Sequence, residues 1–186
     1  MNENEVQAKT FNYKLLLLGE GAVGKTSLIL QYVEKTFTTD YKITLGADFK
    51  SKTVVLEDIP TKGEKITANL QIWDMAGKAK LSSFKKYYYP GTAGAILVFD
   101  TTRRETLAEL LNWNEDVEKY SPGTVKYLIG NKIDLTDEIQ VHEREREQYE
   151  TIMGAAGSIE TSAKTGENVE EVFKTISRLI IERDMN

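Results

Sequence analysis

The chain has 186 residues, 40% of them hydrophobic and 28% charged, with a formal net charge of −5 and no cysteine. This length suits one domain with a substantial core, and the missing cysteines exclude disulfides, thiol catalysis and cysteine-based metal sites. The acidic balance argues against nucleic-acid binding, because that needs a basic face. With no cysteine, Asn at position 2 and no apolar run long enough to span a bilayer, we expect no direct lipid anchor. We expect a cytoplasmic protein that associates with membranes only through a partner.

Residues 1–11 are polar, and we expect a flexible leader there, then a domain over residues 12–183 and a short C-terminal end at 184–186. The first half of the domain predicts these elements: a strand at 13–18, a helix at 24–35, two antiparallel strands at 46–57 and 65–73, and a short helix at 80–89. Two stretches without periodicity, 36–44 and 74–78, are predicted loops.

The second half predicts strands at 95–99, 125–129 and 157–161, each followed by a helix. Thr102 and Glu105 form a capping-box pattern that opens the first of these helices. A charged helix is predicted at 139–153. The last helix has a clear apolar stripe, made of Val169, Val172, Phe173, Ile176, Leu179 and Ile180.

The alternation of strands and helices predicts an α/β fold. We expect a six-stranded, mainly parallel sheet with one antiparallel edge strand from the early hairpin, flanked by about five helices. Ligands of such sheets bind at the carboxyl ends of the strands, so we expect the functional residues in the loops that follow them.

One of these loops, residues 19–26, satisfies the phosphate-loop pattern G-x-x-x-x-G-K-S/T between a predicted strand and a predicted helix. Its glycines let backbone N–H groups approach a phosphate, and the helix dipole favours the same anion. Lys25 can neutralise the β- and γ-phosphates, and the Thr26 hydroxyl can ligate Mg²⁺. A chance glycine-rich turn is the alternative, but the flanking strand and helix favour nucleotide binding.

Two strings that follow later strands point to guanine. Residues 131–134 read N-K-I-D, and the Asp134 carboxylate can accept from guanine N1–H and from the 2-amino group. Adenine offers neither donor and would leave the carboxylate unsatisfied. Residues 161–164 read T-S-A-K, and a backbone N–H there can reach guanine O6. Each string alone is compatible with an ordinary cap or loop, but together they favour a guanine nucleotide.

Two further positions suit the metal and the γ-phosphate. Residues 74–77 read D-M-A-G after the second hairpin strand. Asp74 can hold Mg²⁺ through a water, and the Gly77 N–H can bond a γ-phosphate oxygen. Thr44, in the predicted loop 36–44, can close over Mg²⁺ and the γ-phosphate.

These strings resemble those of the Ras superfamily of small GTPases. Residues 45–50, 72–74 and 160–164 look most like the Rab branch, and the similarity covers about residues 12–180. The resemblance implies a small G-protein version of the P-loop NTPase fold over residues 12–183, which would bind GTP or GDP with Mg²⁺. Its implied nucleotide contacts are Gly21, Ala22, Val23, Gly24, Lys25, Thr26, Ser27, Phe37, Thr44, Gly77, Asn131, Lys132, Asp134, Ser162, Ala163 and Lys164. Its implied Mg²⁺ site is Thr26, Thr44 and Asp74.

The resemblance also implies protein partners. Phe49, Trp73 and Tyr88 match the aromatic triad through which Rab-like proteins meet effectors, although half-buried core packing explains these side chains equally well. The loops near 36–50 and 74–89 would also meet exchange factors and GTPase-activating proteins. We expect the protein itself to be a monomer.

The chain departs from the family at Lys78, where the family has the Gln that orients the attacking water. An ammonium group has no acceptor and cannot take a water proton, although it can offset charge in the transition state. No arginine precedes Arg103, so neither of the predicted loops at 36–44 and 74–78 supplies an arginine finger. We expect slow GTP hydrolysis by a set comprising Lys25, Thr44, Gly77 and Lys78.

Two other readings remain open. The chain can be a binding module that holds its nucleotide with negligible turnover, or a P-loop ATPase or kinase, which the guanine-reading strings oppose. Rab-like proteins typically end in a tail that carries cysteines, and this sequence has none, so we expect it to reach membranes only through a partner. Its hairpin turn near 58–66 looks longer than in Rab-like proteins, with no function assigned.

Overall fold

A single mixed sheet forms the centre of this computed structural model, which describes residues 8–38, 44, 46–57, 59, 65–77 and 85–185. The leader up to residue 7, most of the hairpin turn and Lys78 lie outside the described residues. The strands are β1 (Ala8–Leu18), β2 (Ala47–Leu56), β3 (Lys65–Met75), β4 (Thr92–Asp100), β5 (Val125–Asn131) and β6 (Ser158–Thr161), in the spatial order β2-β3-β1-β4-β5-β6.

Among the described strands, only the β2–β3 pair is antiparallel; β1 pairs in parallel with β3 and β4, and β5 pairs in parallel with β4 and β6. The predicted six-stranded, mainly parallel sheet with one antiparallel edge strand is therefore confirmed.

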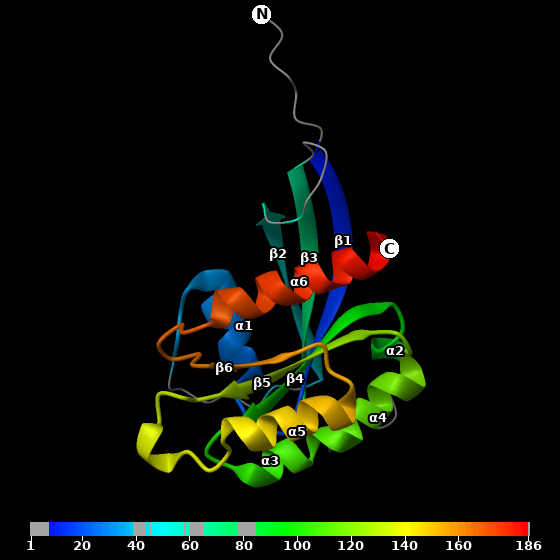
Figure 1. Cartoon of the computed structure of the whole chain (residues 1–186). Helices are drawn as coiled ribbons and strands as arrows, with labels where there is room; N and C mark the ends of the chain where they lie inside the picture. The colour runs from blue at the N-terminus through cyan, green and yellow to red at the C-terminus, as the bar shows by residue number, and fades with distance from the viewer. Residues whose placement is uncertain are drawn as a thin grey trace, which may run out of the picture.

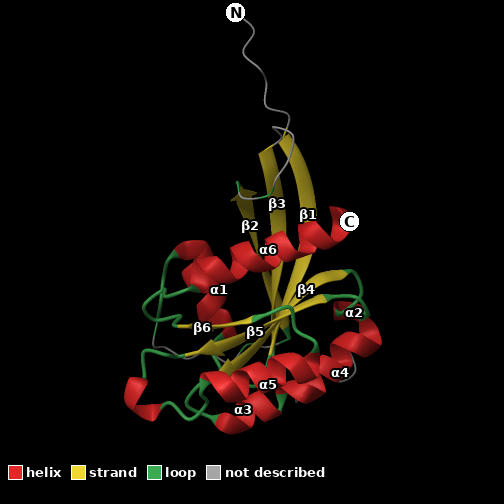
Figure 2. Cartoon of the chain, viewed as in Figure 1, coloured by secondary structure: helices red, strands yellow, loops and turns green. Residues whose placement is uncertain are grey.

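The helices cover both faces of this sheet. They are α1 (Lys25–Glu34), α2 (Lys85–Tyr88), α3 (Arg104–Ala108), α4 (Leu110–Tyr120), α5 (Glu143–Met153) and α6 (Val169–Met185). Figure 1 shows α1 and α6 on one face and α3, α4 and α5 on the other, and Figure 2 shows the same layers by element type. Counting α3 and α4 as one interrupted helix gives the predicted number of about five.

The alternation of side chains along β1 explains the two layers. Leu15 and Leu17 pack in the cluster formed with α1 and α6, whereas Leu16 and Leu18 pack in the cluster formed with α3, α4 and α5. All four leucines are fully buried. A continuous apolar run is what a parallel strand covered on both faces requires.

Three predictions about element boundaries were wrong. β1 begins at Ala8 rather than at residue 13, because residues 8–12 pair with residues 65–69 of β3. The predicted leader therefore gives way to a strand at residues 8–11. The capping box at Thr102 is also wrong, since its hydroxyl donates to Asp100 and the helix begins at Arg104.

The charged helix likewise starts later than predicted, at Glu143, and a short 3₁₀ turn at Thr136–Glu138 precedes it. Among the described helices, none has the length and apolar character needed to cross a membrane.

The sheet brings the predicted site residues to one edge. The strands β1, β3, β4, β5 and β6 run in the same direction, and their carboxyl ends are followed by residues 19–26, 76–77, 101–103, 132–134 and 162–164. This edge is the predicted location of the ligand.

Candidate guanine-nucleotide site

The phosphate loop connects β1 to α1 and requires glycine at two positions. Gly19 has φ +146°, and an added Cβ would lie 2.1 Å from the Val98 carbonyl oxygen. Gly24 has φ +99°, and its added Cβ would lie 2.2 Å from Nδ2 of Asn131. Side chains at these positions would push the loop away from β4 and β5, so the glycines fix its close approach to the sheet.

Lys25, the first residue of α1, is only 6% exposed. Its Nζ donates to the carbonyl oxygens of Gly19, at 2.7 Å, and Glu20, at 2.9 Å. Burial lowers the pKa of Lys25 to about 8, and the carboxylates of Asp74 and Glu20 oppose this shift only in part. The site therefore holds a desolvated cation that an anionic phosphate would stabilise.

This desolvated lysine should take up a proton when nucleotide binds. A phosphate beside Lys25 favours the ammonium form, so binding raises a pKa that starts near 8. At pH 8 we expect uptake of about half a proton per GDP bound. Titration calorimetry in two buffers of different ionisation enthalpy measures this uptake. Binding heats that do not depend on the buffer would contradict the expectation.

Three oxygen-bearing side chains from separate elements meet beside the loop. Thr26 Oγ1 donates to Asp74 Oδ2 at 2.5 Å, and Thr44 Oγ1 lies 3.0 Å from Thr26 Oγ1 and 3.3 Å from Asp74 Oδ2. Burial raises the pKa of Asp74 above its ordinary value, and the Thr26 bond, the charge of Lys25 and the Thr44 bond oppose this. The second carboxylate oxygen, Oδ1, is buried and accepts no hydrogen bond among the described residues.

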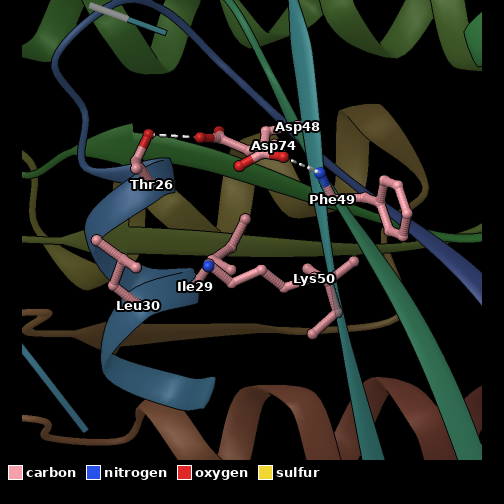
Figure 3. Close-up of a pocket in the computed structure, with 8 residues that line it drawn as sticks. Thr26, Ile29, Leu30, Asp48, Phe49, Lys50 and Asp74 are labelled. Atoms are coloured by element: carbon pink, nitrogen blue, oxygen red, sulfur yellow. Dashed lines mark hydrogen bonds between the residues drawn. The ribbon is translucent and has the colours of Figure 1, made fainter. Parts of the chain in front are cut away.

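This set fits Mg²⁺, because hard oxygen ligands and an unsatisfied buried carboxylate oxygen are what such a cation and its waters use. A pocket lies between α1 and the β2–β3 hairpin, and Figure 3 shows Thr26 and Asp74 close together among the residues that line it. The pocket is lined by Thr26, Ile29, Leu30, Asp48, Phe49, Lys50, Ile72 and Asp74.

Asn131 joins the phosphate loop to the loop at residues 162–164, which follows β6. Its side chain is buried, Nδ2 donates to the Val23 carbonyl at 2.9 Å, and Oδ1 accepts from the Ala163 N–H at 3.1 Å. Oδ1 also accepts from Thr161 Oγ1 at 3.2 Å. Through these bonds Asn131 fixes the phosphate loop relative to the loop that follows β6.

Asp134 lies beside Ser162 and Lys164, which were predicted to contact the same nucleotide. Ser162 Oγ donates to Asp134 Oδ1 at 2.6 Å, and Lys164 Nζ lies 3.7 Å from Oδ2. The Asp134 side chain keeps 13% of its surface exposed. Phe37, which was predicted to pack on the base, is 41% exposed, so its ring is accessible to a ligand.

Two residues of the site were missed by sequence reasoning. Asp100, at the end of β4, is 1% exposed and accepts from Lys132 Nζ at 2.7 Å and Arg103 Nε at 3.0 Å. Burial alone would raise the pKa of Asp100, but the bonds from Lys132, Thr102 and Arg103 outweigh it and hold that pKa below its ordinary value. Arg103 also donates from Nη2 to the Gly21 carbonyl at 3.1 Å. The position of Asp100 directly after the predicted apolar strand 95–99 was the sequence signal that could have identified it as a site residue.

Gly77 and the aromatic triad are two further sets of predicted residues. Gly77 lies against the phosphate loop, since an added Cβ would be 3.0 Å from Gly21 N. Phe49 stacks on Trp73 at 5.4 Å between ring centres, and Tyr88 lies 6.0 Å from Trp73. Phe49 is 56% exposed, whereas Trp73 and Tyr88 pack against the core, so the triad is continuous but only partly exposed.

The phosphate loop lies at one sheet edge with the cluster of Thr26, Thr44 and Asp74 and with the loops at 131–134 and 161–164. This arrangement defines a P-loop nucleotide-binding protein. The Ras family profile matches residues 14–182, and the chain belongs to this family. It is 40% identical over 185 residues to Ras-related protein Rab-8B of Homo sapiens and of Pongo abelii, an overlap of 96% of this chain and 86% of each relative. The Bos taurus protein of the same name is 39% identical. The predicted Rab-like small GTPase is thereby confirmed.

Proposed function

We propose that this small GTPase is a switch that binds GTP or GDP with Mg²⁺ and hydrolyses GTP slowly. The observation that carries the proposal is the convergence of Thr26, Thr44 and Asp74 beside the phosphate loop. Thr44 precedes β2, and Gly77 follows β3, so contacts to a γ-phosphate and its metal would order both segments. Loss of the γ-phosphate would release them and change which partner binds.

Each residue has a distinct task in this proposal. Lys25 would hold the β- and γ-phosphates, and the Gly77 N–H would bond a γ-phosphate oxygen. The hydroxyls of Thr26 and Thr44 would hold Mg²⁺, with Asp74 acting through a water. The bound metal supplies positive charge that offsets the charge of the phosphate oxygens.

The base contacts follow from the neighbouring loops. Asp134 would accept from guanine N1–H and the 2-amino group, and the N–H groups near Ala163 would reach O6. Phe37 would pack on one face of the base and the aliphatic stem of Lys132 on the other, since its ammonium is held by Asp100.

Slow hydrolysis is proposed because Lys78 occupies the position of the water-orienting Gln. A lysine donates hydrogen bonds but accepts none, so it cannot align the attacking water. An activating protein would then have to contribute a water-orienting group as well as an arginine. The alternative is a binding module that keeps its nucleotide with negligible turnover, with which the same substitution is also compatible.

The partner proposals rest on the aromatic triad and its surroundings. Phe49 presents an exposed ring next to Trp73, whose ring centre lies 4.9 Å from Lys14 Nζ. We propose that effectors, exchange factors and activating proteins meet the loops near 36–50 and 74–89 around this triad. We also propose that the protein is a cytoplasmic monomer that reaches membranes through a partner.

Identification of the bound nucleotide tests the function. We expect chromatography of the denatured, purified protein to release GDP, or GTP that decays to GDP over hours when the protein is incubated with Mg²⁺. GTP that persists for days would favour the binding module over the switch. Adenine nucleotide, or a protein that takes up no guanine nucleotide after stripping, would contradict both.

A further inference from the structure

Successive carbonyl groups of the phosphate loop are held by cations from two different elements. Lys25 Nζ bonds the carbonyls of Gly19 and Glu20, and Arg103 Nη2 bonds the next one, that of Gly21, at 3.1 Å. The C=O and N–H of one peptide unit point in opposite directions. The Arg103 contact with the Gly21 carbonyl therefore fixes the direction of the N–H in the same peptide unit, which belongs to Ala22.

The peptide unit that Arg103 holds has a strained neighbour. Ala22 has φ +61°, in the left-handed region that residues with a Cβ rarely adopt. Such a conformation persists only where surrounding contacts maintain it. The bond to the Gly21 carbonyl fixes the peptide whose N–H belongs to Ala22.

Arg103 is itself fixed by a buried carboxylate. Its Nε lies 3.0 Å from Asp100 Oδ2, while Nη2 reaches Gly21, so one planar guanidinium bridges β4 and the phosphate loop. Asp100 is 1% exposed, and the same Oδ2 lies 2.7 Å from Lys132 Nζ of the base-reading loop. Asp100 therefore contacts both the arginine that bonds the phosphate loop and the lysine of the loop at 131–134.

We propose that Arg103 is a positioning residue for nucleotide binding, which holds the Gly21–Ala22 peptide with its N–H facing the phosphates. This inference rests on the proposed binding of guanine nucleotide. Arg103 acts through the loop backbone, so its contribution should affect GDP and GTP alike and should leave the chemical step unchanged once nucleotide is bound.

Dissociation constants for GDP and for a non-hydrolysable GTP analogue test this role in Arg103→Ala and Arg103→Lys. We expect both variants to bind both nucleotides about tenfold more weakly, since loss of a charge-assisted hydrogen bond has effects of this order. Lysine keeps the charge but has a single nitrogen, so it lacks the rigid fork that reaches Asp100 from Nε and Gly21 from Nη2. Single-turnover hydrolysis at saturating protein should stay within about twofold of the parent rate.

Arg104→Ala is the matched control. The neighbouring Arg104 donates to Glu145 Oε2 at 3.1 Å and to the Gln140 carbonyl at 2.8 Å, away from the phosphate loop. Nucleotide affinity should be unchanged in this variant. Thermal unfolding of each variant with saturating GDP shows whether the fold is intact.

A second substitution separates positioning from a general loss of stability. Glycine adopts the left-handed conformation without strain, so the peptide in Ala22→Gly needs less support. Arg103→Ala should therefore weaken binding by only about threefold in the Ala22→Gly background, compared with about tenfold in the parent.

The outcomes are decisive for the inference. Equal losses in the two backgrounds, or unchanged affinity in Arg103→Ala, would overturn it, as would a slower chemical step with affinity intact, because Arg103 would then act on the reacting phosphate. If neither arginine variant folds, Arg103→Gln takes their place, and an affinity for GDP equal to that of the parent would overturn the inference. A parent protein that binds no guanine nucleotide would instead refute the proposed function.

Discussion

Asp134→Ala is expected to weaken GDP binding by roughly 10²- to 10⁴-fold. The proposed contact uses one carboxylate to accept from both N1–H and the 2-amino group of guanine, and each hydrogen bond to a charged group contributes about 1.5–3 kcal/mol. The carboxylate is positioned for this task, because Ser162 Oγ donates to one oxygen and leaves part of the side chain open to solvent. Equilibrium binding of GDP to the stripped protein measures the loss.

Inosine diphosphate makes this test specific for base recognition, because hypoxanthine lacks the 2-amino group. The parent should prefer GDP over inosine diphosphate by about tenfold or more, and Asp134→Ala should bind the two equally weakly. Asp137→Ala is the control, since Asp137 is an exposed carboxylate in the adjoining 3₁₀ turn. A variant that keeps the preference for GDP would show that Asp134 does not read the base.

The parts of this site that could be predicted from sequence are those whose chemistry lies within one short string. Residues 19–26 combine the turn, the cation and the hydroxyl in one loop, so their pattern predicts both structure and ligand. Asp134 and Ser162 could be placed at the same edge of the sheet because each follows a parallel strand, and the structure joins them by a hydrogen bond at 2.6 Å.

The contact between Arg103 and Gly21 could not be predicted, because it joins loops 82 residues apart. Asp100 looked like the polar end of an apolar strand, and Thr102 like the cap of a helix. In the fold, β4 lies next to β1, so the loop after β4 reaches the phosphate loop. Thr102 then bonds Asp100, at 2.7 Å, in place of the helix terminus.

The strand boundary at Ala8 was missed for a related reason. Residues 8–12 alternate weakly, with Phe11 the only large apolar side chain among them, so their local pattern favours a polar leader. Their partner strand, residues 65–69 of β3, extends equally far and supplies the backbone hydrogen bonds. Pairing across the sheet, which no local pattern encodes, extends β1.

Lys78→Gln is expected to accelerate single-turnover GTP hydrolysis by about ten- to 10²-fold. Glutamine combines a carbonyl acceptor and an amide donor, so it can align a water with the γ-phosphate, whereas lysine only donates. Positioned proton-transfer and water-orienting groups typically contribute rate factors of about 10² or more. Phosphate release from preloaded protein measures the rate without interference from nucleotide exchange.

Comparison with Lys78→Ala separates two causes of such an acceleration. If the ammonium only repels or displaces the water, alanine and glutamine should accelerate hydrolysis equally; if orientation of the water is missing, only glutamine should. Lys86→Gln removes an exposed charge from the nearby helix α2 and should leave the rate unchanged. An unchanged or slower rate in Lys78→Gln would mean that this lysine is not what limits turnover. The binding-module reading would then be favoured, because the phosphate loop and metal site would be competent while the chemical step was blocked elsewhere.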